Sequence, residues 1–149
     1  MEHSFQRRPV TEQDLELLLY WRNDPVTRKN SFSKEEVSPE AHRTWLSRKL
    51  QDPGCIMDII SRDGTPVGVL RLDCEESSAE ISYTVAPEAR GTGCGSYIVS
   101  LAEQIVPEGI SVLKAEVLPD NPASIRCFER NGFSCIRSED ALLFSKTIR

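Results

Sequence analysis

Three glycines alternate in the segment Arg90–Ser96 (RGTGCGS), after an apolar–polar alternation and before a helical pattern. Alternating glycines let the backbone turn tightly and bring its N–H groups close to a ligand, with no Cβ in the way. A helix that begins in the segment adds unpaired N–H donors and the positive end of its dipole, which together favour a phosphate. We therefore predict a phosphate-binding loop here, with a glycine-rich turn that holds no ligand as the alternative.

Two familiar phosphate loops fit this segment poorly. A P-loop carries Lys followed by Ser or Thr after its last glycine, whereas this segment continues Gly95-Ser96-Tyr97. A dinucleotide-binding loop opens an early strand–helix–strand unit and is followed by an acidic residue on the next strand. The glycines nearly match that pattern and Glu116 could be the acid, but too few strands follow for a doubly wound sheet.

Hydrophobic periodicity and capping residues predict the elements that must position this loop. Thr11 and Ser38 are typical N-cap residues, and Asn131-Gly132 is a typical helix end. Alternating apolar residues predict strands, and apolar residues three and four apart predict helices. Strands are expected over 4–8, 56–60, 66–72, 79–85, 111–118, 133–137 and 142–148, helices over 11–21, 38–50, 97–106 and 123–130, and a loop with one helical turn over 26–37. The chain, 1–149, is therefore predicted to form one mixed α/β domain.

Size, charge and cysteine content restrict the class of protein. A length of 149 residues suits one domain, and the net charge of −5 argues against general nucleic-acid binding. No apolar run approaches the roughly 20 residues of a membrane-spanning helix, so no membrane partner is expected. The five cysteines form no C-x-x-C pair and the N-terminus has no apolar signal core, which predicts reduced thiols in the cytoplasm. No metal site is expected, because His3 and His42 lie far from any cysteine cluster.

Two motifs together resemble the GNAT acyltransferase superfamily. The acetyl-coenzyme A loop of that family has Gln or Arg, two residues, Gly, one residue, then Gly or Ala, and Arg90, Gly93 and Gly95 occupy these positions. Downstream, Asn121–Phe133 resembles the family's N-x-x-[AS]-x-x-x-[YF]-x-x-x-G-F element. The resemblance covers about residues 56–133. It implies an α/β (α+β) fold with a mixed, twisted central sheet of six to seven strands flanked by about four helices, and an N-acetyltransferase that uses acetyl-coenzyme A without a metal.

The resemblance also assigns roles on the donor side. Backbone N–H groups of the loop would hold the pyrophosphate, and Asn121 would hydrogen-bond the pantetheine arm. A bulge near Tyr83–Val85 would free a backbone N–H to polarise the acetyl carbonyl and to stabilise the oxyanion. The expected cofactor-binding residues are Val85, Arg90, Gly91, Thr92, Gly93, Cys94, Gly95, Ser96, Asn121, Ser124 and Phe128.

Acetyl transfer to an amine needs a base for the amine proton and profits from an acid for the departing thiolate. Many relatives use a tyrosine at the aromatic position of the second motif, but this chain has Phe128, which cannot donate a proton. Tyr83, Ser124 or a bound water are the substitutes. Glu80, on the strand before the loop, is the expected base, and a solvent-facing strand residue without a catalytic role is the alternative. Asp73 and Glu75 are further candidates for the base.

The N-terminal third suggests the acceptor. Its W-R-N segment and later H-x-x-W helix resemble the branch of ribosomal-protein N-terminal acetyltransferases and bacterial nucleotide-sugar N-acetyltransferases, especially enzymes that acetylate the 4-amino group of UDP-linked amino-sugars in pseudaminic acid synthesis. Arg22 and Arg28 could meet an acidic or phosphate-bearing acceptor, and His42 with Trp45 could line its pocket. Core tryptophans and solvated arginines are the alternatives. The expected substrate-binding residues are Trp21, Arg22, Asn23, Arg28, His42 and Trp45.

The expected function is direct transfer of an acetyl group from acetyl-coenzyme A to a primary amine, with a nucleotide-linked amino-sugar as the preferred acceptor. Acetylation of the N-terminus of a ribosomal or other protein is one alternative. A non-catalytic acyl-coenzyme A binding module is another, because Phe128 replaces the usual tyrosine. A homodimer is compatible with the sequence.

Overall fold

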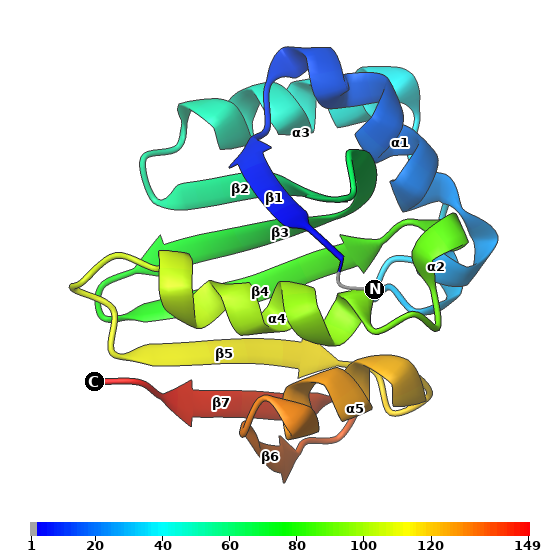
Figure 1. The fold of residues 1–149 in the computed structure, drawn as a ribbon. Helices are drawn as coiled ribbons and strands as arrows, with labels where there is room; N and C mark the ends of the chain where they lie inside the picture. The colour runs from blue at the N-terminus through cyan, green and yellow to red at the C-terminus, as the bar shows by residue number, and fades with distance from the viewer. Residues whose placement is uncertain (1–2) are drawn as a thin grey trace.

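Seven strands form one mixed sheet in the computed structural model, which describes residues 3–149 (Figure 1). The strands are β1 (Phe5–Pro9), β2 (Cys55–Arg62), β3 (Thr65–Glu75), β4 (Ser78–Val85), β5 (Val112–Val117), β6 (Ser134–Arg137) and β7 (Leu142–Thr147). They lie in the order β1-β2-β3-β4-β5-β7-β6, and neighbours are antiparallel except β4 and β5, which are parallel. The predicted mixed α/β fold is confirmed.

Several of the helices begin at a residue whose side chain caps the first backbone N–H groups. Within the described residues the helices are α1 (Leu15–Asn23), α2 (Pro25–Lys29), α3 (Pro39–Gln51), α4 (Cys94–Ile105) and α5 (Pro122–Arg130), with 3₁₀ turns η1 (Glu12–Asp14) and η2 (Pro87–Ala89). Ser38 Oγ accepts from the N–H of Ala41 at 3.1 Å, as its position before Pro39 predicts. The single helical turn expected within 26–37 becomes α2, because the Asp24 carboxylate caps its first N–H groups.

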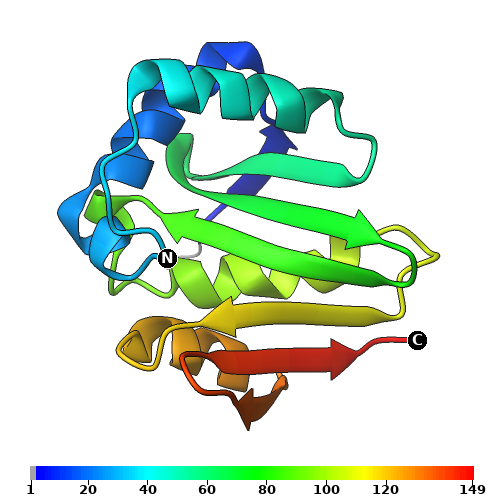
Figure 2. The ribbon, with the colours of Figure 1, turned by 180° about the vertical axis from the view of Figure 1, so that it is seen from behind.

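The helices cover both faces of the sheet. α4 crosses β3 and β4 on one face, in front of the sheet in Figure 1, and α5 packs beside it. α3 lies on the opposite side and is close to the viewer in Figure 2. Ile98 of α4 and Leu70 and Leu72 of β3 are fully buried in the core. This apolar burial anchors α4, and with it the glycine loop at the beginning of α4.

β4 and β5 are paired only where they begin. The parallel ladder joins Ser78–Glu80 to Val112–Lys114, and among the described residues the rest of β4 has no strand partner on that side. Successive N–H groups of a strand point to opposite neighbours. Because the N–H of Ala86 donates to the carbonyl of Val67 in β3 at 2.8 Å, the N–H groups of Tyr83 and Val85 point away from β3, toward the opening between β4 and β5.

The prediction of a bulge at Tyr83–Val85 is wrong. β3 and β4 pair without a register shift from Gly68 and Val85 to Glu75 and Ser78. The separation of β4 from β5 frees the backbone donors instead, so no extra residue is needed in the strand. This separation depends on pairing between distant segments, which local periodicity does not report.

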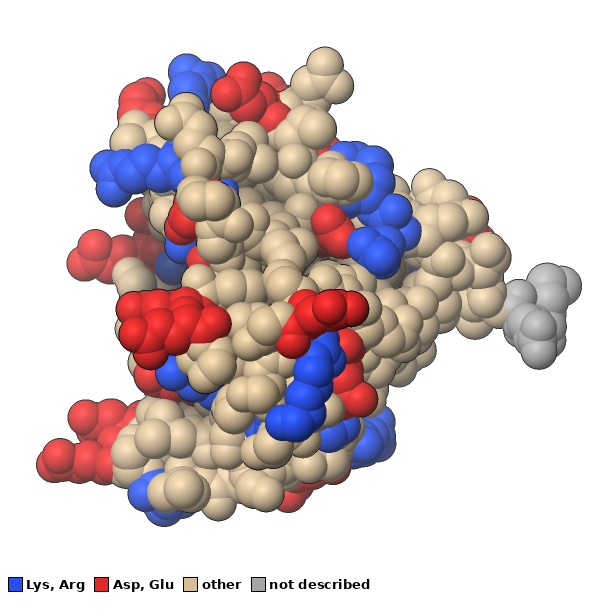
Figure 3. Space-filling model, turned by 90° about the vertical axis from the view of Figure 1, so that its left-hand side faces the viewer, with Lys and Arg blue, Asp and Glu red and all other residues tan. Residues whose placement is uncertain are grey.

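Surface charge is mixed rather than segregated on the face shown in Figure 3. Lys and Arg groups lie among Asp and Glu groups there, with uncharged surface between them. No helix within residues 3–149 is long and apolar enough to cross a membrane.

Candidate active site

The glycine loop adopts the conformation that its sequence predicts. Gly91 and Gly93 have φ angles of 74° and 86°, in the left-handed region that side chains other than glycine rarely adopt. Gly93 is the N-cap of α4, and no side chain caps this helix end. The N–H groups of the first turn of α4, which lack partners inside the helix, therefore remain available to a ligand.

A cavity of about 460 Å³ lies at this helix end, where the sequence predicts the donor site. We call it the donor cavity. The predicted cofactor-binding residues that line it are Val85, Arg90, Gly91, Gly93, Gly95, Ser96, Asn121 and Ser124. Gly95 is required by close packing, because a Cβ there would lie 3.0 Å from Cys127 Sγ and 3.4 Å from Val85 Cγ2. α5 can therefore approach the first turn of α4 and close one side of the donor cavity.

Three predicted cofactor-binding residues do not line the donor cavity. Phe128 is buried, stacked on Phe144 with ring centroids 5.2 Å apart, so its side chain belongs to the core. Cys94 is also buried, at 1% exposure. Thr92 Oγ1 donates to the carbonyl of Ala89 at 2.5 Å and stabilises the turn before α4.

The donor cavity also contains two arginines that sequence reasoning missed. Arg126 and Arg130 project from α5 into its lining. Their spacing of four residues places them on one face of a helix, one turn apart, and this was the available signal. Two guanidinium groups near the predicted phosphate-binding loop suit a ligand with several negative charges.

Tyr83 and Ser124 meet at the inner wall of the donor cavity. The Tyr83 hydroxyl donates to Ser124 Oγ at 2.8 Å, and the Tyr83 ring packs edge-on against Phe128 at 6.0 Å. Burial and the neighbouring Cys127 raise the pKa of Tyr83, and the hydrogen bond with Ser124 only partly opposes this shift. The phenol therefore stays protonated at neutral pH and can act as a hydrogen-bond donor.

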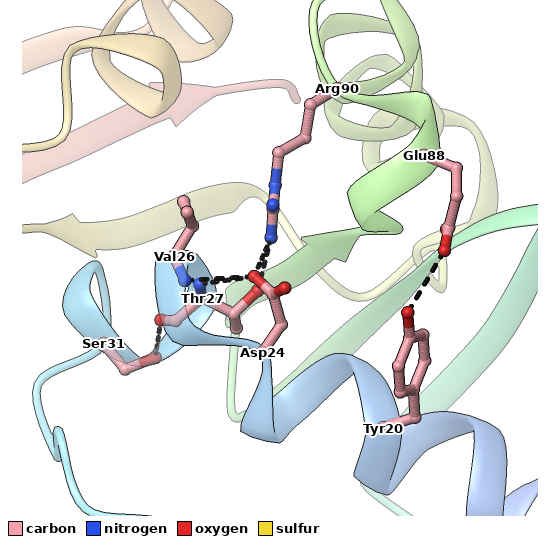
Figure 4. A network of polar contacts seen from close by, with 7 residues as sticks. All are labelled: Tyr20, Asp24, Val26, Thr27, Ser31, Glu88 and Arg90. Atoms are coloured by element: carbon pink, nitrogen blue, oxygen red, sulfur yellow. Dashed lines mark hydrogen bonds and ion pairs between the residues drawn. The ribbon is translucent and has the colours of Figure 1, made fainter.

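Arg90 joins the glycine loop to α2, as Figure 4 shows. Its guanidinium pairs with the Asp24 carboxylate and also donates to Thr27 Oγ1 at 3.2 Å. Burial alone would raise the pKa of Asp24, but the hydrogen bonds from Arg90 and from backbone N–H groups lower it overall. A second link, from the Tyr20 hydroxyl to Glu88 Oε1 at 3.2 Å, holds α1 against η2.

A second cavity, of about 580 Å³, lies beneath α1 and α3 on the other face of the sheet, and we call it the acceptor cavity. Four of the predicted substrate-binding residues line it: Trp21, Arg22, His42 and Trp45. Asn23 and Arg28 do not line it. Asn23 exchanges two hydrogen bonds of 2.8 Å with the backbone of Val37, and Arg28 Nε donates to the carbonyl of Lys34 at 3.2 Å. Both side chains therefore shape the segment between α2 and α3.

Two side chains that line the acceptor cavity have a buried polar atom without a hydrogen-bond partner in the described residues, Arg22 Nη1 and His42 Nε2. His42 is buried, and its Nε2 has no hydrogen-bond partner in the described part of the chain. Burial, and secondarily the charge of Arg22, lowers the pKa of His42, so its imidazole is neutral at pH 7. A neutral ring with a free nitrogen can accept a proton.

Glu80, the expected base, is not brought to either cavity. It is exposed near the beginning of β4, opposite Asp73 of β3 and Lys114 of β5. Alternation had correctly placed Glu80 on the strand before the loop. The cavities, however, meet at the other end of β4, where β5 has separated from it.

The two cavities share Ser31, Tyr83 and Thr84 in their linings. Side chains alternate along β4, so Tyr83 faces Ser124 on one side of the sheet, while Ser82 bonds Arg71 on the other at 3.0 Å. Because the two linings share these residues, a group held in one cavity can lie close to a group held in the other. This arrangement suits group transfer between two bound molecules.

Comparison with known proteins places this architecture in a family. L-2,4-diaminobutyric acid acetyltransferase of Nocardia farcinica (strain IFM 10152) is 33% identical over 66 residues, 44% of this chain and 34% of that protein. The chain thus spans about a third of the length of that relative. YwnH of Bacillus subtilis (strain 168), provisionally named a phosphinothricin acetyltransferase, is 26% identical over 136 residues, covering 85% of this chain and 82% of the relative.

A solved structure and a family model extend the comparison across the chain. The ribosomal-protein-alanine N-acetyltransferase from Brucella melitensis is 27% identical with a TM-score of 0.77, covering 95% of this chain and 99% of that one. The model of the acetyltransferase (GNAT) domain matches residues 7–134, which include both cavities' main elements. Because this match covers most of the chain, the protein belongs to the GNAT family of acetyltransferases.

Proposed function

We propose that this protein transfers the acetyl group of acetyl-coenzyme A directly to the primary amine of a small molecule. The observation that supports the proposal best is that two cavities with different linings share Tyr83 and Thr84. One cavity ends at an uncapped helix N-terminus with arginines, and the other is lined by aromatic side chains. Membership of the GNAT family supports acetyl transfer as the chemistry.

The donor cavity fits coenzyme A in its chemistry. The first turn of α4, with Arg126 and Arg130, would bind the phosphates, and Asn121 lies where the second motif places it. Coenzyme A supplies the thioester whose acetyl group is transferred. The free N–H of Val85 points into the opening beside β4, where it would polarise the acetyl carbonyl and stabilise the oxyanion.

Proton handling falls to His42 and Tyr83 in this proposal. No Asp or Glu is among the described residues that line the acceptor cavity, so His42 replaces Glu80 as the candidate base for the amine. Tyr83 would donate a hydrogen bond to the departing sulfur. Complete proton transfer would be uphill, because its raised pKa exceeds a thiol's value of about 8.5. Tyr83 thereby supplies the hydroxyl that Phe128 lacks.

The experiment combines a binding measurement with a turnover measurement. Titration with acetyl-coenzyme A by calorimetry tests the donor cavity, and release of free thiol tests transfer. The acceptor panel contains 2,4-diaminobutyrate, a UDP-linked 4-amino-sugar and a short peptide with a free N-terminal alanine. We expect binding of acetyl-coenzyme A and thiol release with small amines. Absence of binding at millimolar acetyl-coenzyme A would refute the proposal, and binding without turnover on any amine would favour a non-catalytic module.

The acceptor panel also tests two more specific hypotheses about the acceptor. The likeness to the Brucella enzyme, at 27% identity over nearly the whole chain, favours acetylation of a protein N-terminus as the second candidate function. The W-R-N and H-x-x-W segments suggested the nucleotide-linked amino-sugar. Thiol release with the peptide alone would select the former candidate, and release with the UDP-linked sugar alone would select the latter.

A further inference from the structure

We infer that the acceptor carries an anionic group, a carboxylate or a phosphate, in addition to its amine, and that Arg22 binds this group. This inference rests on the proposed function, because it names the class of molecule that occupies the acceptor cavity. Its basis is a charged group in that cavity whose hydrogen-bonding capacity is only partly used.

Arg22 is held in place by one end of its guanidinium and is free at the other. Its Nη2 donates to the carbonyl of Ser33 at 3.0 Å, while its Nη1 is buried and has no partner in the described residues. Burial and, secondarily, the charge of Arg28 lower the pKa of Arg22. Burial of a charged group costs free energy unless the group is paired, so we expect Nη1 to have a hydrogen-bond partner when the cavity is occupied.

Arg71, which lines the same cavity, differs from Arg22 because its guanidinium has hydrogen-bond partners on both sides. Its Nε donates to Asp73 Oδ2 at 2.9 Å, its Nη2 donates to Ser82 Oγ at 3.0 Å, and it lies over the Trp45 ring at 5.2 Å. Asp73 also pairs with Lys49 at 2.8 Å. This carboxylate therefore already serves two cations and adds nothing for Arg22.

The charge balance of the acceptor cavity defines the ligand class. Its described lining contains Arg22 and Arg71 but no acidic residue. An acceptor with a carboxylate or phosphate would supply the missing acceptor oxygens for Nη1 of Arg22, in the charge-assisted geometry that guanidinium groups favour. A polyamine would instead place a second positive charge beside Arg22. The anionic end would lie against Arg22 and the amine would lie toward Tyr83 and Thr84.

Intrinsic fluorescence gives a binding assay that does not need turnover. The chain has two tryptophans, Trp21 and Trp45, and both line the acceptor cavity. Two matched pairs of probes differ only in the anion: 2,4-diaminobutyrate against 1,3-diaminopropane for a carboxylate, and glucosamine 6-phosphate against glucosamine for a phosphate. The variants are Arg22→Met, Arg22→Lys, and Arg43→Met as a control, since Arg43 is exposed on α3 outside both linings.

We expect at least one anionic probe to bind about 30-fold more tightly than its neutral partner, as for one strong charge-assisted pair. Arg22→Met should remove this preference, Arg22→Lys should keep part of it, and Arg43→Met should leave it unchanged. Which pair shows the preference distinguishes carboxylate from phosphate.

Equal binding of both members in both pairs, or an anion preference that survives in Arg22→Met, would overturn the inference. So would a lack of binding by all four probes. Failure of the proposed function is recognised separately. In that case Arg22-dependent binding of an anionic probe would persist, while acetyl-coenzyme A would fail to bind or no thiol would be released.

Discussion

Replacing Tyr83 by Phe tests the proton chemistry most directly. The substitution removes one oxygen atom, which donates to Ser124 Oγ at 2.8 Å, and keeps the ring that packs edge-on against Phe128. A typical intramolecular hydrogen bond contributes about 1 kcal/mol to stability. For a domain of this size, a loss of that amount lowers the melting temperature by about 2–4 °C. The variant should therefore fold.

The effect on catalysis should be larger than the effect on stability. If the Tyr83 hydroxyl donates to the departing sulfur, its removal should lower kcat by about 100-fold, as for other positioned proton donors. The affinity for acetyl-coenzyme A should change less than twofold, because the phosphates are bound elsewhere in the donor cavity. Thiol release gives kcat and calorimetry gives the affinity.

A second tyrosine provides the matched control. Tyr97 stacks on Phe5 with ring centroids 3.9 Å apart and lines neither cavity, so Tyr97→Phe removes the same atom away from the site. We expect Tyr97→Phe to keep wild-type kcat. If Tyr83→Phe retains more than half of the wild-type kcat, or if the two variants lose activity equally, the role given to the Tyr83 hydroxyl is wrong.

Three further predictions concern the loop, the sheet and a thiol. Gly93→Ala should lower the free energy of unfolding by about 1–2 kcal/mol, because φ is +86° there, and should weaken the binding of acetyl-coenzyme A in calorimetry. Gly64→Ala, at φ +85° in the β2–β3 turn, should lower the free energy of unfolding by a similar amount without weakening this binding. Gly68→Ala should lower the free energy of unfolding in urea by about 3 kcal/mol, since its Cβ would lie 2.5 Å from the Thr84 carbonyl oxygen. Burial and the nearby Asp73 raise the pKa of Cys55 to about 11, from the 9.0 of an unperturbed thiol. Its alkylation at pH 8, followed by mass spectrometry, should therefore be about 100-fold slower than for an unperturbed thiol, and should accelerate as the pH rises toward 11.

Local features of the sequence predicted the donor side well. Left-handed glycines, a helix beginning and a helical spacing are properties of consecutive residues, so the turn at Gly91 and Gly93 could be predicted from the sequence alone. Family resemblance added the position of Asn121, whose side chain caps α5 and which lines the donor cavity. Motif position misled at Phe128, because the buried stripe of α5 turns that side chain into the core.

The acceptor side was less predictable, because its geometry depends on contacts between distant segments. In the sequence, Arg22, Asn23 and Arg28 looked alike as polar residues that follow the helix predicted over 11–21. Successive residues of a helix point about 100° apart, so Arg22 reaches the acceptor cavity while Asn23 turns to the backbone of Val37. Glu80 lies outside both cavities for a similar reason: periodicity identified β4 but did not locate where β5 separates from it.

Under the proposed function, the ion pair between Arg90 and Asp24 would make the binding of donor and acceptor interdependent. A phosphate that drew the Arg90 guanidinium away from Asp24 would remove a contact that holds α2. Val26 and Thr27 of α2 line the donor cavity, and α2 leads to Ser31, which lines both cavities. Occupancy of the donor cavity would then alter the free energy of filling the acceptor cavity. Reciprocity requires that the acceptor change the affinity for the donor by the same factor by which the donor changes the affinity for the acceptor. An Asp24→Asn variant, which cannot form the ion pair, separates these two binding equilibria.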